Sequence, residues 1–196
     1  MKYRSQTIIH SFSRLLNLFI IPKKEWNAIA QEETSVKSLF LYFAIPVIAA
    51  CSIISFFGVL IHTKSIGVSI SQLFVSFFSL IIGLFFAAKI IILLAPNFQL
   101  TIKPYIIFQL IIYSGAAFCV FHGIAKLFSP YSFLNQICLL CELYFIRILW
   151  IGTTPLLPIA ENKKPGFTIM ASLLVLVLPL IFDRMFSILF KLPVTI

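Results

Sequence analysis

Five long apolar blocks, separated by short polar or proline-bearing turns, make up most of this chain. A helix needs roughly 20 apolar residues to cross the hydrocarbon core of a bilayer, and each block reaches that length. Of the 196 residues, 61% are hydrophobic and only 11% are charged, so little chain remains for a separate soluble domain. The blocks also lack the short alternating runs of a membrane β-barrel. We therefore predict an all-α integral membrane protein with five transmembrane helices, over residues 39–61, 71–94, 105–127, 133–156 and 167–190.

The chain before the first block is predicted to be a distinct segment. Residues 1–38 form a cytoplasmic or interfacial unit, and residues 39–196 form the transmembrane domain. Apolar residues of the segment recur at helical spacing on one face, namely Ile8, Ile9, Phe12, Leu15, Leu16, Phe19 and Ile20. This pattern predicts an amphipathic helix that lies on the membrane surface. An uncleaved signal sequence is the alternative, because the first residues are basic.

Lysine and arginine are concentrated on one side of the predicted helices. Nine of them lie in the N-terminal segment or in loops on its side of the membrane: Lys2, Arg4, Arg14, Lys23, Lys24, Lys37, Lys103, Lys163 and Lys164. The opposite side has Lys64, Lys126 and Lys191. Because cytoplasmic loops carry the excess of basic residues, we expect a cytoplasmic N-terminus and an external C-terminus. We expect Trp26 and Trp150 to lie near the cytoplasmic interface of the membrane.

Small residues in the third block indicate a helix-packing surface. Gly115, Cys119 and Gly123 recur at every fourth position, which allows another helix to approach closely. We interpret them as a packing seam within the chain, with a dimer interface as the alternative. Pro46 and Pro179 lie inside the first and fifth blocks, where each removes a backbone hydrogen bond and can bend its helix.

Four ionisable residues fall within the last two blocks: Glu142, Arg147, Asp183 and Arg184. Charged groups inside a membrane are costly and are expected to have partners. Depth counted at about 1.5 Å per residue pairs Glu142 with Arg184, and pairs Asp183 with Arg147 less closely. Such pairs either fix the packing of the helices or form part of a proton or ion path.

The sequence offers no convincing catalytic site. Cys138 and Cys141 form a C-x-x-C pair inside an apolar helix, where buried small residues are more common than a redox or metal site. Ser114 and His122 lie on one helix about 12 Å apart, beyond hydrogen-bond reach. We expect no enzyme activity, no cofactor and no metal. The basic residues form no continuous face, so nucleic acid is not an expected partner.

The stretch PKKEWNAIAQEETSVKSLFLYFAIPVIAA, residues 22–50, combines a proline, charged residues, a tryptophan, an acidic cluster and a second proline within the first block. It resembles the start of the membrane domain of bacterial Yip (Ypt-interacting protein) family proteins. The stretch WIGTTPLLPIAENKKPGFTIM, residues 150–170, resembles the short basic turn before that family's last span. The resemblance implies a non-enzymatic multi-pass membrane protein, with a bacterial cytoplasmic (inner) membrane as the expected location. Eukaryotic members are linked to Rab-type GTPases, but their Asp-Leu-x-Gly-Pro stretch is missing here, which places a GTPase partner in doubt.

The expected function is a membrane-organising or protein-interaction role, with the lipid bilayer and another membrane protein, or a second copy, as partners. The candidate contact face consists of Lys23, Lys24, Glu25, Trp26, Glu32, Glu33, Lys163 and Lys164. The same face could act only as a membrane anchor, since each basic residue near anionic lipid contributes about 1 kcal/mol. The alternatives are an accessory subunit of a larger complex, or a small oligomeric transporter or channel that uses the four intramembrane charges.

Overall fold

The computed structural model describes residues 8–192 of the chain, and within this range every regular element is a helix. Lys2 and Arg4, with the side chains of Ile8 and Ile9, lie outside what it describes. The elements in chain order are α1 (Ile8–Ile20), α2 (Pro22–Ala30), α3 (Val36–Leu39), η1 (Phe40–Ala44), α4 (Ile45–Thr63), α5 (Ile66–Leu94), η2 (Ala95–Phe98), α6 (Pro104–Leu127), α7 (Ser132–Glu142), α8 (Tyr144–Leu156) and α9 (Lys164–Leu189).

Within the described range, five helical segments are long and apolar enough to cross a membrane. They are Val36–Thr63, Ile66–Phe98, Pro104–Leu127, Ser132–Leu156 and Lys164–Leu189. The predicted all-α class and the predicted number of long apolar helices are therefore confirmed. The second segment starts earlier than the predicted residue 71, because the Ser65 side chain caps α5 by accepting a hydrogen bond from the Val68 N–H.

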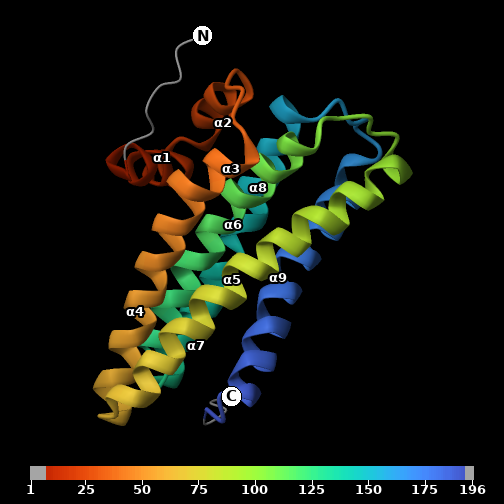
Figure 1. Cartoon of the computed structure of the whole chain (residues 1–196). Coiled ribbons are helices and arrows are strands. Elements are labelled where there is room, and N and C mark those ends of the chain that lie inside the picture. The colour runs from red at the N-terminus through yellow and green to blue at the C-terminus, as the bar shows by residue number, and fades with distance from the viewer. Residues whose placement is uncertain (1–7, 193–196) are drawn as a thin grey trace.

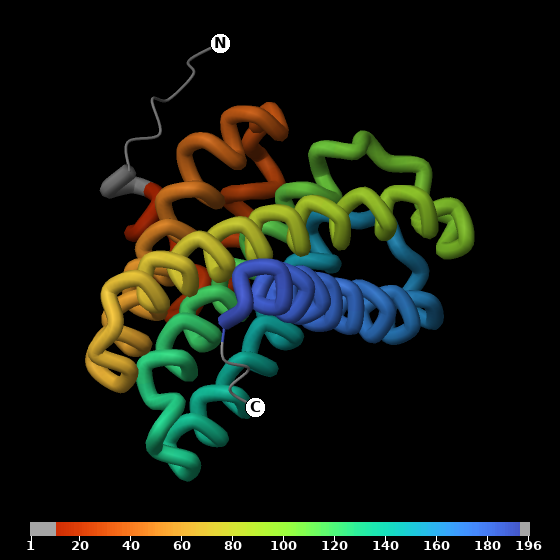
Figure 2. Tube along the Cα trace, turned by 60° about the horizontal axis from the view of Figure 1, so that its bottom comes forward, coloured from red at the N-terminus to blue at the C-terminus, as the bar shows by residue number. Residues whose placement is uncertain are grey.

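Helix α6 is the central helix of the bundle. Its apolar stretch is 72% buried, whereas those of the other four segments are 33–39% buried. It packs against α4, α5, α7 and α8, and α9 packs mainly along α5 (Figure 2). Figure 1 shows α1 and α2 at one end of the bundle, together with the α5–α6 and α8–α9 connections. We refer to this as the N-terminal end, and to the end with the α4–α5 turn as the opposite end.

The first of these segments, Val36–Thr63, is called the first span below. It begins irregularly, and this irregularity ties it to α1. Residues Phe40–Ala44 form a wide π-helical turn, and Pro46 follows in the first turn of α4. Pro46 has no N–H to donate to the carbonyl of Tyr42, four residues earlier. The Ser11 hydroxyl of α1 donates to this carbonyl. The proline thus leaves a backbone acceptor that α1 uses to attach to the first span.

The small residues of α6 lie against helices of the same chain. A Cβ added at Gly123 would lie 2.9 Å from the carbonyl oxygen of Cys51 on α4, so this close approach requires glycine. A Cβ added at Gly115 would lie 2.6 Å from a methyl carbon of Leu84 on α5, and Cys119 is fully buried. The chain's own helices fill this seam, rather than a second copy.

The described part of the N-terminal segment packs as part of the bundle. Leu18, Trp26 and Ile29 belong to the same hydrophobic core as the spans. Leu16, on the apolar face predicted to lie on the membrane, is 58% exposed, whereas Arg14 is turned toward the bundle and is 5% exposed. The reason is that α1 packs against polar groups of α2 and α6, which select a partly polar face for burial.

Candidate functional site

Trp26 is the anchor that fixes α2 to the bundle. Its side chain is fully buried, and its indole Nε1 donates a hydrogen bond to the carbonyl oxygen of Ile148 on α8 at 3.0 Å. Gly152 on the same helix leaves space for the ring, because a Cβ there would lie 2.6 Å from the indole carbon Cε2. Trp26 is therefore not part of an exposed contact face and does not lie at the surface as an interfacial ring, contrary to the expectation from sequence.

Arg14 joins three parts of the N-terminal end. Its guanidinium donates to both carboxylate oxygens of Glu32, at 2.6 and 2.7 Å, and to the Tyr113 hydroxyl of α6 at 3.0 Å. Its Nε lies 3.0 Å from Glu25 of α2, an ion pair whose geometry does not make a hydrogen bond. Asn17 Nδ2 donates to the other oxygen of Glu25 at 3.0 Å. The side chain of Arg14 thus connects α1, α2, the loop after α2 and α6.

The charge on Arg14 is permanent at any physiological pH. Burial on its own lowers the pKa of the guanidinium, but the hydrogen bonds to Glu32 and Tyr113 and the nearby charge outweigh it, and the pKa is raised. Because the folded pKa lies above the unfolded one, the stabilisation is complete below the usual arginine pKa and is lost only as the pH rises through the folded value. Loss of the Arg14 charge therefore does not limit the cluster at any pH at which a cell operates.

The candidate contact face is smaller than the sequence predicts. Lys23, Lys24 and Glu33 are exposed, whereas the carboxylates of Glu25 and Glu32 are committed to Arg14. The two carboxylates turn toward Arg14 because their negative charge stabilises its buried guanidinium. The exposed remainder is a short basic surface at the N-terminal end.

The other two members of the predicted face lie at the α8–α9 connection. Lys163 is half-buried and Lys164 is buried. Lys164 Nζ donates to Thr154 Oγ1 at 2.7 Å and lies 4.6 Å from the ring centroid of Trp150. A cation over an indole face is stabilised by the ring quadrupole, so Lys164 acts inside the fold rather than on its surface.

The ionisable groups of the spans have partners that the depth argument did not identify. Glu142 Oε1 lies 3.0 Å from Nδ1 of His122 on α6, and both side chains are less than 10% exposed. Glu142 thus pairs with His122 and not with Arg184, because α7 packs mainly against α6 and meets the groups on that helix. The ring of Phe118 stacks on the imidazole at 5.4 Å between centroids.

Asp183 on α9 likewise pairs with α6. Its Oδ1 accepts from Lys126 Nζ at 2.6 Å, and the same amine lies 3.4 Å from the Ser76 hydroxyl of α5. Arg147, its expected partner, is exposed and lies over the Tyr144 ring on its own helix. Arg184 is also exposed. Of the four charges predicted to pair with one another, the two acids are therefore paired with α6, and the two arginines face outward.

The residues considered for catalysis are engaged in ordinary helix contacts. The Ser114 hydroxyl donates to the Leu110 carbonyl at 2.6 Å. Cys138 and Cys141 are free thiols, both half-buried. Among the residues that the structure describes, no group of three or more His, Cys, Asp or Glu side chains is placed to hold a metal ion.

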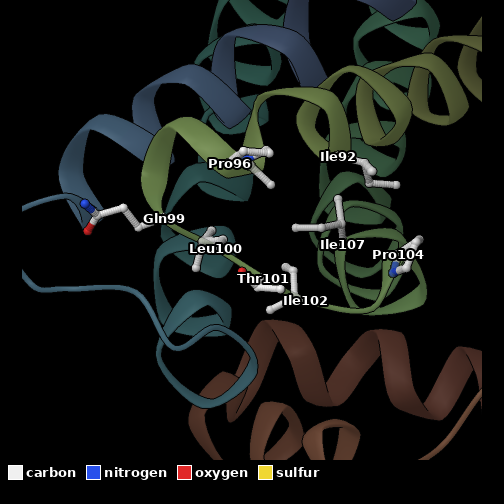
Figure 3. Close-up of a pocket in the computed structure, with 9 residues that line it drawn as sticks. Ile92, Pro96, Gln99, Leu100, Thr101, Ile102, Pro104 and Ile107 are labelled. Atoms are coloured by element: carbon white, nitrogen blue, oxygen red, sulfur yellow. The ribbon is translucent and has the colours of Figure 1, made fainter.

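A cavity of about 330 Å³ lies at the N-terminal end, where α5 passes through η2 into α6. Figure 3 shows Ile92, Ile102 and Ile107 around it, while the amide of Gln99 extends away from them. Gln99 has a left-handed backbone (φ 59°), which turns the chain out of η2. None of the described residues that line the cavity is ionisable, so the cavity offers a ligand shape but no charge.

Arg14, Lys126 and the pairing role of His122 were missed by sequence reasoning. The spacing of His122 and Lys126, one helical turn apart on the third apolar block, is a signal that could have identified these two residues. Comparison of the chain with protein-family models, with curated proteins and with solved structures gives no match.

Proposed function

We propose that this is a multi-pass membrane protein of the Yip-like type, without enzyme activity, that presents a fixed basic surface for interaction at the cytoplasmic side of a bacterial inner membrane. The observation that carries this proposal is the attachment of the N-terminal segment to the bundle through Arg14 and Trp26. A segment held at both points keeps Lys23 and Lys24 at set positions on the bundle. A simple lipid anchor would not need this rigidity.

The distribution of charge supports the proposed orientation. The N-terminal end carries Lys23, Lys24, Lys37, Lys103 and Lys163, and the opposite end carries Lys64 and Lys191. An excess of basic residues is typical of the cytoplasmic side of a membrane protein. The N-terminus is accordingly proposed to be cytoplasmic and the C-terminus external.

A small oligomeric transporter or channel is the second candidate function. The buried pairs His122–Glu142 and Lys126–Asp183 favour it, since ionisable groups inside spans often mark proton or ion pathways. Each acid, however, has a basic side chain of α6 within 3.0 Å, either the His122 imidazole or the Lys126 amine, as expected for groups that fix packing. The interaction role is therefore the better supported of the two.

Photo-crosslinking in native membranes tests the interaction role. A photoreactive residue replaces Lys24 on the exposed basic surface, and a matched probe replaces Lys64 at the opposite end. We expect a discrete protein adduct from position 24 that is weaker when Arg14→Met loosens the segment, and no such adduct from position 64. Adducts with lipid alone at both positions would reject the interaction role.

Proton flux in vesicles separates the two candidates. Purified protein and its Glu142→Gln variant are reconstituted, and a pH gradient is followed with an entrapped dye. The proposed role predicts the same passive leak for both as for empty vesicles. A flux that the parent supports and the variant lacks would make the protein a transporter.

A further inference from the structure

An apolar groove of about 520 Å³ runs along the side of the bundle, between the start of the first span and α5. Its walls come from α3, η1, the first turn of α4 and the middle of α5. Leu41 and Phe86, which line it, are 50% and 46% exposed. The groove therefore opens sideways, on a surface that belongs to two of the five membrane-spanning segments.

Two phenylalanines that line the groove, Phe40 and Phe85, pack on the buried Phe108 of α6. The Phe40 ring packs edge-on against Phe85 at 6.1 Å and against Phe108 of α6 at 6.0 Å, measured between ring centroids. Phe85 and Phe108 are 5.7 Å apart, and Phe108 is 3% exposed. Aromatic rings packed in this way on a buried residue hold their positions, so the groove exists without a ligand.

The length of the groove matches one leaflet of a bilayer. Its residues extend from Val36 to Ile45 on one wall and from Phe86 back to Ile81 on the other. Nine helical steps from position 36 to 45 cover about 14 Å, close to the roughly 15 Å of hydrocarbon in one leaflet. An extended acyl chain fits this depth.

Positive charge marks the end of the groove that lies nearer the N-terminal end of the bundle. Lys37 lines the groove there, and Lys89 Nζ lies 5.7 Å from the ring centroid of Phe85. Both lysines are exposed. None of the described residues that line the groove is acidic, so the amines have no carboxylate partner within it.

We propose that an anionic phospholipid occupies this groove, with an acyl chain between the first span and α5 and its phosphate at Lys37 and Lys89. The inference rests on the proposal that the chain spans a membrane. A second copy of the protein fits less well, because a two-fold interface at this groove would bring the same lysines of both copies together. The lysines of the two copies would repel one another in such an interface, whereas an anionic headgroup neutralises them.

Tryptophan quenching by brominated lipids tests the proposal. Leu41→Trp places a fluorophore in the groove, and Ile45→Trp repeats the measurement one turn deeper. Ile53→Trp, on α4 outside the groove and 48% exposed, is the control position. Each variant is reconstituted with the same mole fraction of brominated phosphatidylglycerol or brominated phosphatidylcholine, and the signal of the parent with Trp26 and Trp150 is subtracted.

We expect the anionic lipid to quench the groove positions more strongly than the zwitterionic lipid, and both to quench Ile53→Trp equally. A lysine near an anionic headgroup is worth about fivefold in local enrichment. The preference should vanish in Lys37→Ala/Lys89→Ala and persist in Lys23→Ala/Lys24→Ala, which removes the same charge from the same end.

Four results would overturn the proposal. The first is equal quenching of the groove positions by the two lipids. The second and third concern the preference for anionic lipid: it survives in Lys37→Ala/Lys89→Ala, or it is lost equally in Lys23→Ala/Lys24→Ala. The fourth is that neither lipid quenches the groove positions although position 53 is quenched. The last result would place protein in the groove. Absence of quenching at every position, including 53, would instead refute membrane insertion itself and with it the proposed function.

Discussion

Replacement of Arg14 by Met tests whether this one side chain holds the N-terminal segment on the bundle. Methionine keeps much of the aliphatic volume but removes the ion pairs to Glu25 and Glu32 and the hydrogen bond to Tyr113. The Glu25 side chain is only 12% exposed and would keep just one donor, the Asn17 amide. The variant therefore strands a largely buried negative charge.

The size of the effect follows from burial. Removal of one partner of a buried ion pair costs 3–5 kcal/mol, because the other charge is left without compensation. The Glu32 side chain is 37% exposed, so water replaces part of what it loses. We therefore expect the lower end of the range, about 3 kcal/mol. This corresponds to a change of roughly a hundredfold in the ratio of attached to detached segment.

Limited trypsin digestion in detergent measures this ratio. Cleavage after Lys23 or Lys24 requires α2 to unwind, and its rate follows the population of the open form when opening is fast. We expect cleavage of Arg14→Met to be roughly a hundredfold faster than that of the parent. Arg14→Met/Glu25→Gln should recover part of the loss, since it removes the stranded charge. Lys103→Met, at an exposed lysine, should change nothing. Equal cleavage of Arg14→Met and the parent would refute the reasoning.

Two further substitutions test the packing of the bundle by thermal denaturation in detergent. Gly152→Ala should lower the midpoint by the equivalent of about 1–3 kcal/mol, because the new Cβ collides with Trp26, whereas Gly67→Ala, with no neighbour within 4 Å, should not. A normal midpoint for Gly152→Ala would mean that the Trp26 site is loose. Lys126→Met should lower the midpoint by stranding Asp183, and Lys126→Met/Asp183→Leu should restore most of it. A double variant as unstable as the single one would show that the amine has another role.

The five long helices were predictable because their signal is local. A hydropathy average over roughly 20 residues does not depend on what each helix packs against, so the lengths of the apolar blocks were enough to predict the number of long helices. The start of α5 was placed too late because Ser65 and the polar residues after it lower the average, although Ser65 caps the helix. Caps shift boundaries in ways that hydropathy does not register.

The position of Trp26 was not predictable from its own neighbourhood. Charged residues around a tryptophan beside an apolar block are typical of a membrane interface, and that pattern is the same whether the ring lies outward or inward. The inward position depends on Gly152, which lies on α8, far along the chain. Only the tertiary fold brings Gly152, which has no side chain, next to the large ring of Trp26.

The charge pairs were not predictable from depth along the helices for a related reason, which bears on function. Depth along a helix says how far a charge lies from the membrane surface, but not which helix stands beside it. Here the central helix α6 supplies both basic partners, the His122 imidazole and the Lys126 amine, and the outer helices α7 and α9 supply the acids. Separation of α9 from α6 would therefore leave the Lys126 and Asp183 charges unpaired, and separation of α7 from α6 would leave the buried Glu142 without its His122 partner. Both changes are unfavourable in an apolar medium. A transport mechanism that separates these helices would incur this free-energy cost in every cycle. In a protein that presents a fixed surface, the same pairs make the bundle rigid.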